Sequence, residues 1–456
     1  MKKYILIILC CLTSFPLWSY NVNMIVEHYS VDQGLPNNTV NCTLKDRDGF
    51  IWFGTWYGLC CFDGVKFKTF NKQEHDSDVP PRKIQRIVED KNGYIWVKTI
   101  DRKLYVFNKV TECFHAVYDD MKNYSENIQV IKLQNTAEGD VLLLTKDKNL
   151  LLAGVDEKGQ VTIKILFDSR DEINKHDYTL KHHVLCETEE YISWIGTDYK
   201  VSAVHKGAEL ASRPADFITS KINSGDKDSF TSFFEDGRKV WVGDRAGIFY
   251  SIDVRTGLVN RYVLSEIKGA ISNLLVTPAG YVYLSVAGQG TYEYDLAERR
   301  LQKINTEMND AMVTHAFIDQ YDKIWFHENE KALIYYDPLN HTAKRFPFTM
   351  FGKITTLYSE DAGERGLFFL SPAGEAWLFD REHAEMVYIN KLKQLSNDRA
   401  NQQFYHLMLD NDGVLWLSSA DEGVYCMNFP KKQFNLLSLS PQSAGQENYT
   451  IGVRAL

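Results

Sequence analysis

The sequence predicts an all-β fold of the β-propeller class, with one seven-bladed ring followed by the start of a second, incomplete propeller. Three observations predict it. A segment with an aspartate–glycine turn and an aromatic strand recurs at intervals of about 41 to 51 residues. Each copy holds four short runs with the two-residue periodicity of strands. The second run is apolar on both faces, as a strand buried between neighbouring sheets must be.

The clearest copy runs from residue 40 to residue 70. A strand at 40–45 leads through the turn Asp46-Arg47-Asp48-Gly49 into a tryptophan-centred run at 50–55, and Gly58-Leu59 opens the third strand. Such a turn between two alternating runs is typical of a hairpin. Four antiparallel strands per copy are the pattern of a propeller blade. Eight further copies centre on Trp96, 141–144, Trp194, Trp241, 281–284, Trp325, 367–369 and Trp416.

The closure of the ring is predicted from the need to protect the outer sheet edges. Propellers have about 4–8 blades, and seven is common. Residues 24–30 have the pattern of a lone outer strand, and we expect them to complete the seventh blade near residue 340. Residues 341–348 would then be the borrowed strand of a second ring that continues beyond residue 456. The alternative is one irregular ring of eight or nine blades plus a tail.

The first twenty residues have the pattern of a secretory signal peptide. Lys2 and Lys3 precede an apolar run from residue 4 to residue 12, and a short polar exit follows near Ser19. The run is shorter than the ~20 residues of a membrane span, although an uncleaved anchor is the alternative. The predicted domains are therefore a signal peptide at 1–20, a propeller at 21–340 and the first blades of a second propeller at 341–456.

Charge and cysteine content limit the kind of partner. The formal net charge of -9 argues against nucleic acid, which selects for basic faces. Export permits disulfides, but the spacing shows no regular framework, so small buried thiols are expected. No CxxC motif is present, and no metal or other cofactor is expected. The cysteines after the signal peptide are Cys42, Cys60, Cys61, Cys113, Cys186 and Cys426.

The sequence contains no catalytic constellation that predicts an enzyme. It lacks HExxH, GxSxG and a Walker lysine loop. His182-His183 has no spaced third ligand, and we expect His315 and His406, which occupy the same place in their copies, to be satisfied structural histidines. Calcium is an alternative for the turn carboxylates, but turn stabilisation explains them with fewer assumptions. These carboxylates are Asp46, Asp48, Asp410 and Asp412.

Propeller topology predicts which face binds a ligand. Connections between second and third strands emerge on the same face as those between blades, whereas the other face carries tight turns, so recognition should use the former. Aromatic faces suit the C–H faces of a sugar, and charged side chains suit its hydroxyls. Packing of the aromatic pair on a neighbouring blade and solvated arginines are the alternatives. The candidates are Trp56, Tyr57, Asp101, Arg102, Asp198, Tyr199, Asp244, Arg245 and Gln289.

The opening motif resembles a known family. The segments Tyr29-Ser30-Val31-Asp32-Gln33-Gly34-Leu35-Pro36 and Asp48-Gly49-Phe50-Ile51-Trp52-Phe53-Gly54-Thr55, with Gly58-Leu59, resemble the two-component regulator propeller repeat. Together with the signal peptide, the chain resembles the periplasmic sensor half of hybrid two-component systems from gut bacteria. The copies near 143 and 368 depart from the pattern because they lack tryptophan.

The resemblance implies a function and a set of partners. In the family, two seven-bladed propellers precede an immunoglobulin-like domain, a transmembrane helix, a histidine kinase, a receiver and a DNA-binding domain, and the sensor half recognises oligosaccharides and controls glycan utilisation. We therefore expect a non-catalytic periplasmic sensor that works with those downstream modules, with a homodimer as one arrangement. The alternatives are a propeller lyase or glycosidase, which needs paired carboxylates, and a protein-docking scaffold.

Overall fold

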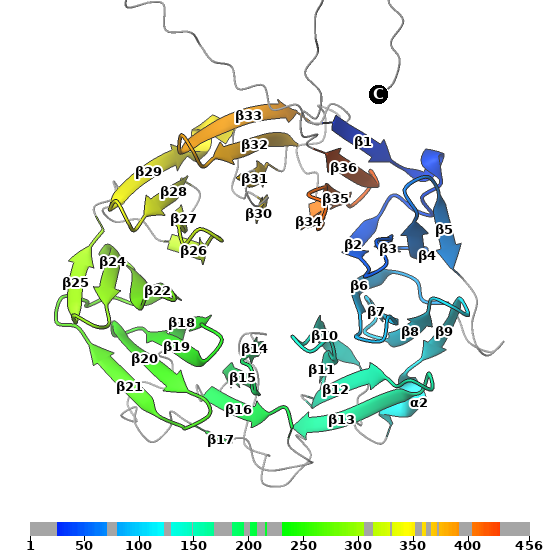
Figure 1. Cartoon of the computed structure of the whole chain (residues 1–456), viewed down its shortest axis with the longest axis horizontal. Coiled ribbons are helices and arrows are strands. Elements are labelled where there is room, and N and C mark those ends of the chain that lie inside the picture. Colours follow the sequence, from blue (N-terminus) through cyan, green and yellow to red (C-terminus); the bar gives the residue numbers. More distant parts are fainter. Residues whose placement is uncertain are drawn as a thin grey trace, which may run out of the picture.

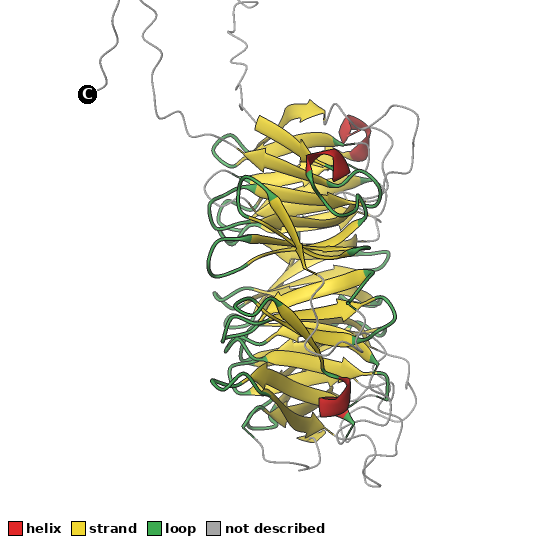
Figure 2. Cartoon of the chain, turned by 90° about the vertical axis from the view of Figure 1, so that its right-hand side faces the viewer, coloured by secondary structure: helices red, strands yellow, loops and turns green. Residues whose placement is uncertain are grey.

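The computed structural model describes most of the chain as a ring of small antiparallel sheets (Figure 1). Seen edge-on, the ring is a flat disc with loops and turns on both faces (Figure 2). No helix in the described part is long and apolar enough to cross a membrane. The structure describes residues 25–70, 80–122, 129–147, 149–167, 185–195, 201–207, 215–216, 230–304, 313–328, 331–351, 358–361, 366–371, 374–391 and 404–428.

The described residues form nine four-stranded sheets, whose first strands lie around the centre and whose fourth strands lie at the rim (Figure 1). Sheets one and two contain β2 (Val40–Lys45), β3 (Ile51–Thr55), β4 (Gly58–Phe62), β5 (Phe67–Phe70), β6 (Ile84–Glu89), β7 (Ile95–Thr99), β8 (Leu104–Asn108) and β9 (Cys113–Ala116). Sheets three and four contain β10 (Val130–Asn135), β11 (Val141–Thr145), β12 (Leu150–Val155), β13 (Val161–Phe167), β14 (Leu185–Glu187), β15 (Tyr191–Ile195), β16 (Val201–His205) and β17 (Ala215–Asp216).

The remaining sheets follow the same order round the ring. Sheets five and six contain β18 (Phe230–Glu235), β19 (Lys239–Asp244), β20 (Ile248–Asp253), β21 (Val259–Val263), β22 (Ile271–Val276), β23 (Tyr281–Val286), β24 (Gly290–Asp295) and β25 (Arg300–Lys303). Sheets seven to nine contain β26 (Val313–Ile318), β27 (Ile324–Glu328), β28 (Ala332–Asp337), β29 (Thr342–Pro347), β30 (Tyr358–Asp361), β31 (Leu367–Leu370), β32 (Glu375–Asp380), β33 (Glu385–Lys391), β34 (Phe404–Leu409), β35 (Leu415–Ser419), β36 (Val424–Asn428) and β1 (Ile25–Tyr29). The short helices are η1 (Val31–Gln33), α2 (Tyr118–Met121) and η3 (Phe348–Phe351).

A buried aspartate organises the turn between the first and second strands. In sheet one, Asp46 Oδ1 accepts hydrogen bonds from the backbone N–H groups of Asp48 and Phe50, and Asp46 Oδ2 accepts one from Trp52 Nε1 at 2.7 Å. The turn carboxylate is therefore also the partner of the tryptophan that fills the gap between sheets, because a buried indole N–H needs an acceptor. The same indole bond joins Asp90 to Trp96, Asp236 to Trp241, Asp319 to Trp325 and Asp410 to Trp416.

Two sheets without this tryptophan also lack the aspartate. Threonine takes its place in the turn, and its hydroxyl accepts the backbone N–H of Asp140 in sheet three and of Tyr281 in sheet six. The side chain six positions after the threonine is then Leu142 or Tyr283, neither of which is an indole. A hydroxyl suffices for the turn. In sheet four, Thr188 Oγ1 likewise accepts the N–H of Tyr191 although Trp194 lies six positions after it, so the aspartate does not accompany every indole.

The expected closure of a seven-bladed ring by residues 24–30 is wrong, because β1 pairs with β36 and not with the seventh sheet. The seventh sheet takes β29 as its own fourth strand, and it offers β1 no free edge there. Tyr29 instead packs against Phe62, Phe67 and Trp416, which lie in the cluster joining sheet nine to sheet one. The pairing of the described strands is that of the alternative, a single ring.

The domain boundary near residue 340 stays a prediction that limited proteolysis tests. The pairing of β1 with β36 predicts a resistant fragment that extends to about residue 428, because removal of sheets eight and nine would expose the edges they cover. Mass spectrometry of the fragments after brief protease treatment measures its end. A stable fragment that ends near residue 340 would contradict the single ring and support two propellers.

Candidate ligand-binding face

Backbone hydrogen bonds place the predicted ligand-binding connections on one face of the ring. Lys83 N donates to Trp56 O, and Ile100 N donates to Lys83 O, each at 2.9 Å. Val130 N donates to Arg102 O, also at 2.9 Å. Each bond ties a connection between second and third strands to a connection between sheets. These two kinds of connection therefore share one face of the ring, as the topology predicts. We call this face the connection face.

Trp56 and Tyr57 are exposed on this face, at 41% and 59% of their surface. Their turn is fixed by Thr55, whose Oγ1 accepts the N–H of Tyr57 at 3.1 Å and donates to the carbonyl of Gly58 at 2.8 Å. The Lys83 ammonium lies over the Trp56 ring, 5.4 Å from its centroid. The pair is thus displayed on a rigid turn with a cation beside it, and it is not buried against a neighbouring sheet.

Asp101 and Arg102 occupy the equivalent turn of sheet two. Asp101 accepts a hydrogen bond from the Thr99 hydroxyl, and its carboxylate lies 3.5 Å from Lys103 Nζ. Burial acts to raise the pKa of Asp101, but these two partners outweigh it and hold the pKa below its usual value. Arg102 has a φ of 67°, and its half-buried side chain has no carboxylate partner among the described residues. The arginine, more than the aspartate, is free to bind a ligand.

The structure uses two other candidates to hold its own backbone. Asp244 is buried, and its Oδ1 accepts the N–H groups of Ala246 at 2.9 Å and Ile248 at 2.8 Å. Gln289 clamps the preceding connection, because its side chain accepts from the N–H of Lys268 and donates to the carbonyl of Glu266.

Three predicted site residues remain, of which one is exposed and two lie outside the described residues. Arg245 is exposed on the connection face. Asp198 and Tyr199 lie outside the described residues, as do the adjacent histidines at 182–183. The sequence-based reasoning missed four cations of sheet two, which are Arg82, Lys83, Arg86 and Lys98. The basic run at 82–86 could have pointed to the first three, of which Lys83 lies over the Trp56 ring.

A repeated β-bulge shapes the mouth of the central channel on the connection face. Seven first strands, those of sheets one, two, three, five, six, seven and nine, shift register at their second residue. Bulges bend a strand and re-aim side chains. Asn41 Nδ2 donates to Ile84 O, and Thr231 Oγ1 donates to Ile271 O, so the bulged residues tie neighbouring sheets together. The mouth is thereby held rigid.

His406 lies three residues into β34, beside this mouth. Its Nδ1 atom is buried and has no hydrogen-bond partner among the described residues, so the expectation of a satisfied histidine is wrong for this atom. Burial and the nearby Arg86 guanidinium lower the pKa of His406 to about 4. The ring is therefore neutral near pH 7 and adds no charge to the channel.

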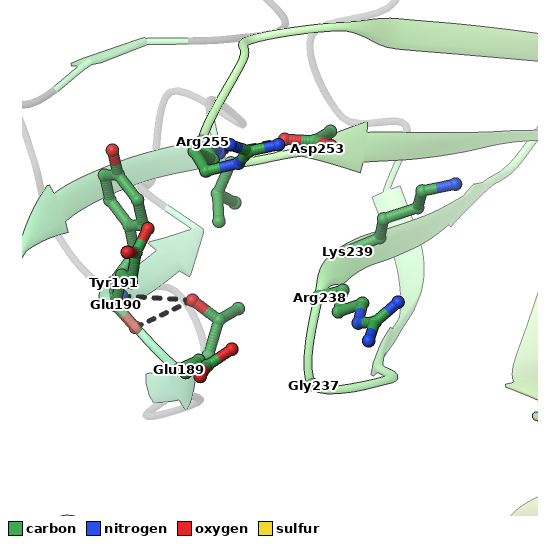
Figure 3. A pocket seen from close by; sticks show the side chains of 10 residues that line it. Glu189, Glu190, Tyr191, Gly237, Arg238, Lys239, Asp253 and Arg255 are labelled. Atoms are coloured by element: carbon green, nitrogen blue, oxygen red, sulfur yellow. Dashed lines mark hydrogen bonds between the residues drawn. The ribbon is translucent and has the colours of Figure 1, made fainter.

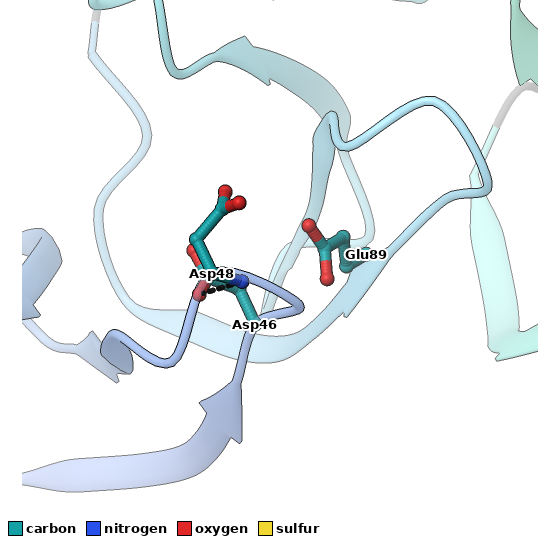
Figure 4. Close-up of side chains that lie close together, drawn as sticks. All are labelled: Asp46, Asp48 and Glu89. Atoms are coloured by element: carbon teal, nitrogen blue, oxygen red, sulfur yellow. Dashed lines mark hydrogen bonds between the residues drawn. The ribbon is translucent and has the colours of Figure 1, made fainter.

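Three carboxylates on the opposite face have the spacing of a metal site. Asp46, Asp48 and Glu89 each offer an oxygen within 4.8 Å of the others (Figure 4). Lys109 Nζ contacts all three, at 3.0, 2.7 and 2.8 Å respectively. These hydrogen bonds outweigh burial and raise the pKa of Lys109. The ammonium lies among the three carboxylates and offsets part of their charge, and Arg47 pairs with Glu89, which favours turn stabilisation over calcium for these aspartates.

The opposite face also carries a pocket of about 470 Å³ between sheets four and five (Figure 3). It is formed by the tight turns at 188–191 and 237–239 and by residues 253–255. Both signs of charge line it, with Glu189 and Glu190 on one side and Arg238 on the other (Figure 3). The pocket contains none of the residues that the sequence analysis singled out.

Comparison with known proteins identifies the repeat. Residues 34–57 match the family described as the two component regulator propeller, and a search of curated proteins found no match to the chain. Among solved structures, the extracellular domain of a hybrid two-component system from B. thetaiotaomicron is 13% identical, with a TM-score of 0.36, over 88% of this chain and 66% of that one.

Two further structures are similar to this chain. The extracellular domain of a second hybrid two-component system from B. thetaiotaomicron is 14% identical, with a TM-score of 0.33, over 91% of this chain and 61% of that one. Virginiamycin B lyase from Staphylococcus aureus is 8% identical, with a TM-score of 0.34, over 89% of this chain and 99% of that one. The chain spans less than two thirds of the two extracellular domains. The match at residues 34–57 confirms the resemblance drawn from the sequence, because this segment matches the two component regulator propeller family.

Proposed function

We propose that the chain is an exported, periplasmic sensor propeller of a hybrid two-component system and that it binds an oligosaccharide on its connection face. The observation that carries the proposal is the exposed Trp56–Tyr57 pair with the Lys83 ammonium beside it. The two-component regulator propeller repeat at residues 34–57 supports the signalling role. Ligand binding would shift the balance between two arrangements of the sensor and its downstream modules.

The chemistry of the connection face suits a sugar. An aromatic ring stacks on the C–H face of a pyranose, and lysine or arginine donates hydrogen bonds to its oxygens. The backbone of the turn that carries Trp56 and Tyr57 is held by the hydrogen bonds of Thr55. Such preorganisation reduces the entropy that a ligand must overcome. The same features make this face better suited to recognition than the tight turns of the opposite face.

Calorimetric titration with an oligosaccharide panel tests the proposal when it is combined with an assay for cleaved product. We expect binding without turnover, and Trp56→Ala should weaken affinity about tenfold or more, which corresponds to ~1.4 kcal/mol. Phe50→Ala is the matched control, because Phe50 is 42% exposed in the same sheet but lies on the opposite face. Turnover of a sugar would support a lyase or glycosidase, and equal affinities of both variants would exclude this face.

A further inference from the structure

Five cations without carboxylate partners gather on sheet two at the connection face. The basic run at 82–86 and the end of β7 bring them together, and none forms an ion pair with any residue that the structure describes. The chain has an overall charge of -9, so this group of positive charges contrasts with the chain as a whole. The five residues are Arg82, Lys83, Arg86, Lys98 and Arg102.

Lys98 is the buried member of the group. Only 6% of it is exposed, and Nζ donates to Gln85 Oε1 at 2.9 Å and to Ile131 O at 2.6 Å. An ammonium has three donors and both of these acceptors are neutral, so the charge lacks a counter-ion. Burial, with the neighbouring Arg102 charge, lowers the pKa of Lys98 to about 8. An anion bound beside it would supply the missing counter-charge.

The contacts of Arg86 and Lys83 relate them to Lys98 and to Trp56. Arg86 lies directly opposite Lys98 in the pairing of β6 with β7. Lys83 accepts a backbone hydrogen bond from Ile100 and stands over the Trp56 ring. The carboxylate of this turn, Asp101, is engaged by Thr99 and Lys103. Lys83 therefore lies beside the aromatic pair, whereas Arg86 and Lys98 lie opposite each other on β6 and β7.

Three cations elsewhere in the described ring are paired with carboxylates. Lys109 contacts three carboxylates, Lys206 contacts Glu138 and Glu187, and Arg381 contacts Asp319 and Asp361. These cations lie in the turns between strands, where they link neighbouring sheets. Because the cations of 82–102 have no carboxylate partner among the described residues, their charge is available to a ligand.

We infer that the ligand is an acidic oligosaccharide, with carboxylate or sulfate groups that lie against the cations of sheet two while a sugar ring stacks on Trp56. The inference rests on the proposed sugar-binding function and names the class of sugar. Guanidinium groups bind carboxylate and sulfate through paired N–H donors, and lysine contributes a compact charge. A neutral sugar would leave the Lys98 charge without a counter-ion.

Titration of the full chain with three tetrasaccharides tests the inference. One is built of galacturonate units, one of sulfated chondroitin units and one of neutral galactose units. We expect an acidic tetrasaccharide to bind more tightly than the neutral one, and its affinity to fall as salt rises. Lys98→Met and Arg102→Asn should each weaken acidic binding about tenfold or more, and asparagine tolerates the positive φ of residue 102. The two acidic probes distinguish carboxylate from sulfate.

Arg255→Gln is the control, because it removes one exposed positive charge on the opposite face and should leave acidic binding unchanged. Tighter binding of the neutral tetrasaccharide, with affinity insensitive to Lys98→Met and Arg102→Asn, would overturn the acidic class and leave the sugar sensor standing. Binding of none of the three would count against both. Circular dichroism of each variant shows whether it is folded. If Lys98→Met does not fold because Lys98 is buried, Arg102→Asn at the half-buried position still tests the inference.

Discussion

Gly423→Ala should destabilise the protein far more than Gly280→Ala. The two glycines have nearly the same conformation, with φ of 89° and 87°, but their surroundings differ. A Cβ at residue 423 would lie 2.2 Å from the carbonyl oxygen of Tyr29, whereas a Cβ at residue 280 meets nothing within 4 Å. The left-handed conformation costs ~1–2 kcal/mol at either position. Overpacking against backbone adds ~1–3 kcal/mol at residue 423 alone.

The contact with Tyr29 exists because β1 closes the ring on β36. Gly423 also donates its N–H to Asn38 O at 2.9 Å, so the substitution strains both links between the ends of the ring. Urea denaturation, followed by tryptophan fluorescence, measures the two free energies of unfolding. Gly280→Ala controls for the backbone conformation. Equal losses in the two variants would show that residue 423 does not face Tyr29, and would contradict this closure.

The sheets could be predicted from the repeat, whereas the closure of the ring could not. The spacing of the aspartate turns and tryptophan strands depends on local chemistry, and each sheet forms where that pattern places it. Closure depends instead on which distant edge the strand at 25–29 meets. Residues 342–347 and 25–29 have similar outer-strand patterns, so periodicity alone could not tell which of them completes the seventh sheet.

The candidate site was predictable at the level of the face. Topology places Trp56, Tyr57 and Arg102 on the connection face, and their exposure agrees with a role in binding. Asp244 and Gln289 look equally suitable in the sequence, but a carboxylate or amide can satisfy the backbone as readily as a ligand. Lys98 was missed because an isolated lysine in an apolar strand carries no signal of its burial.

Asp46→Ala should lower the free energy of unfolding by about 3–5 kcal/mol, the loss typical when one member of a buried ion pair is removed. Only 5% of Asp46 is exposed, and it accepts hydrogen bonds from two backbone N–H groups of its turn. It also accepts from Trp52 Nε1 and lies 3.0 Å from Lys109 Nζ. The substitution leaves the indole N–H and part of the ammonium charge unpaired between sheets one and two.

Asp48→Ala is the matched control, because Asp48 lies in the same turn and contacts the same Lys109 at 2.7 Å, but its side chain is 56% exposed. We expect little change in this variant, since water replaces the lost contact. A double-mutant cycle of Asp46→Ala with Trp52→Phe then isolates the indole bond, because phenylalanine keeps the ring and removes the N–H. The two losses should add to more than the double variant loses. Strict additivity would show that Asp46 acts through the turn alone, and that the aspartate and tryptophan of each repeat are present for separate reasons.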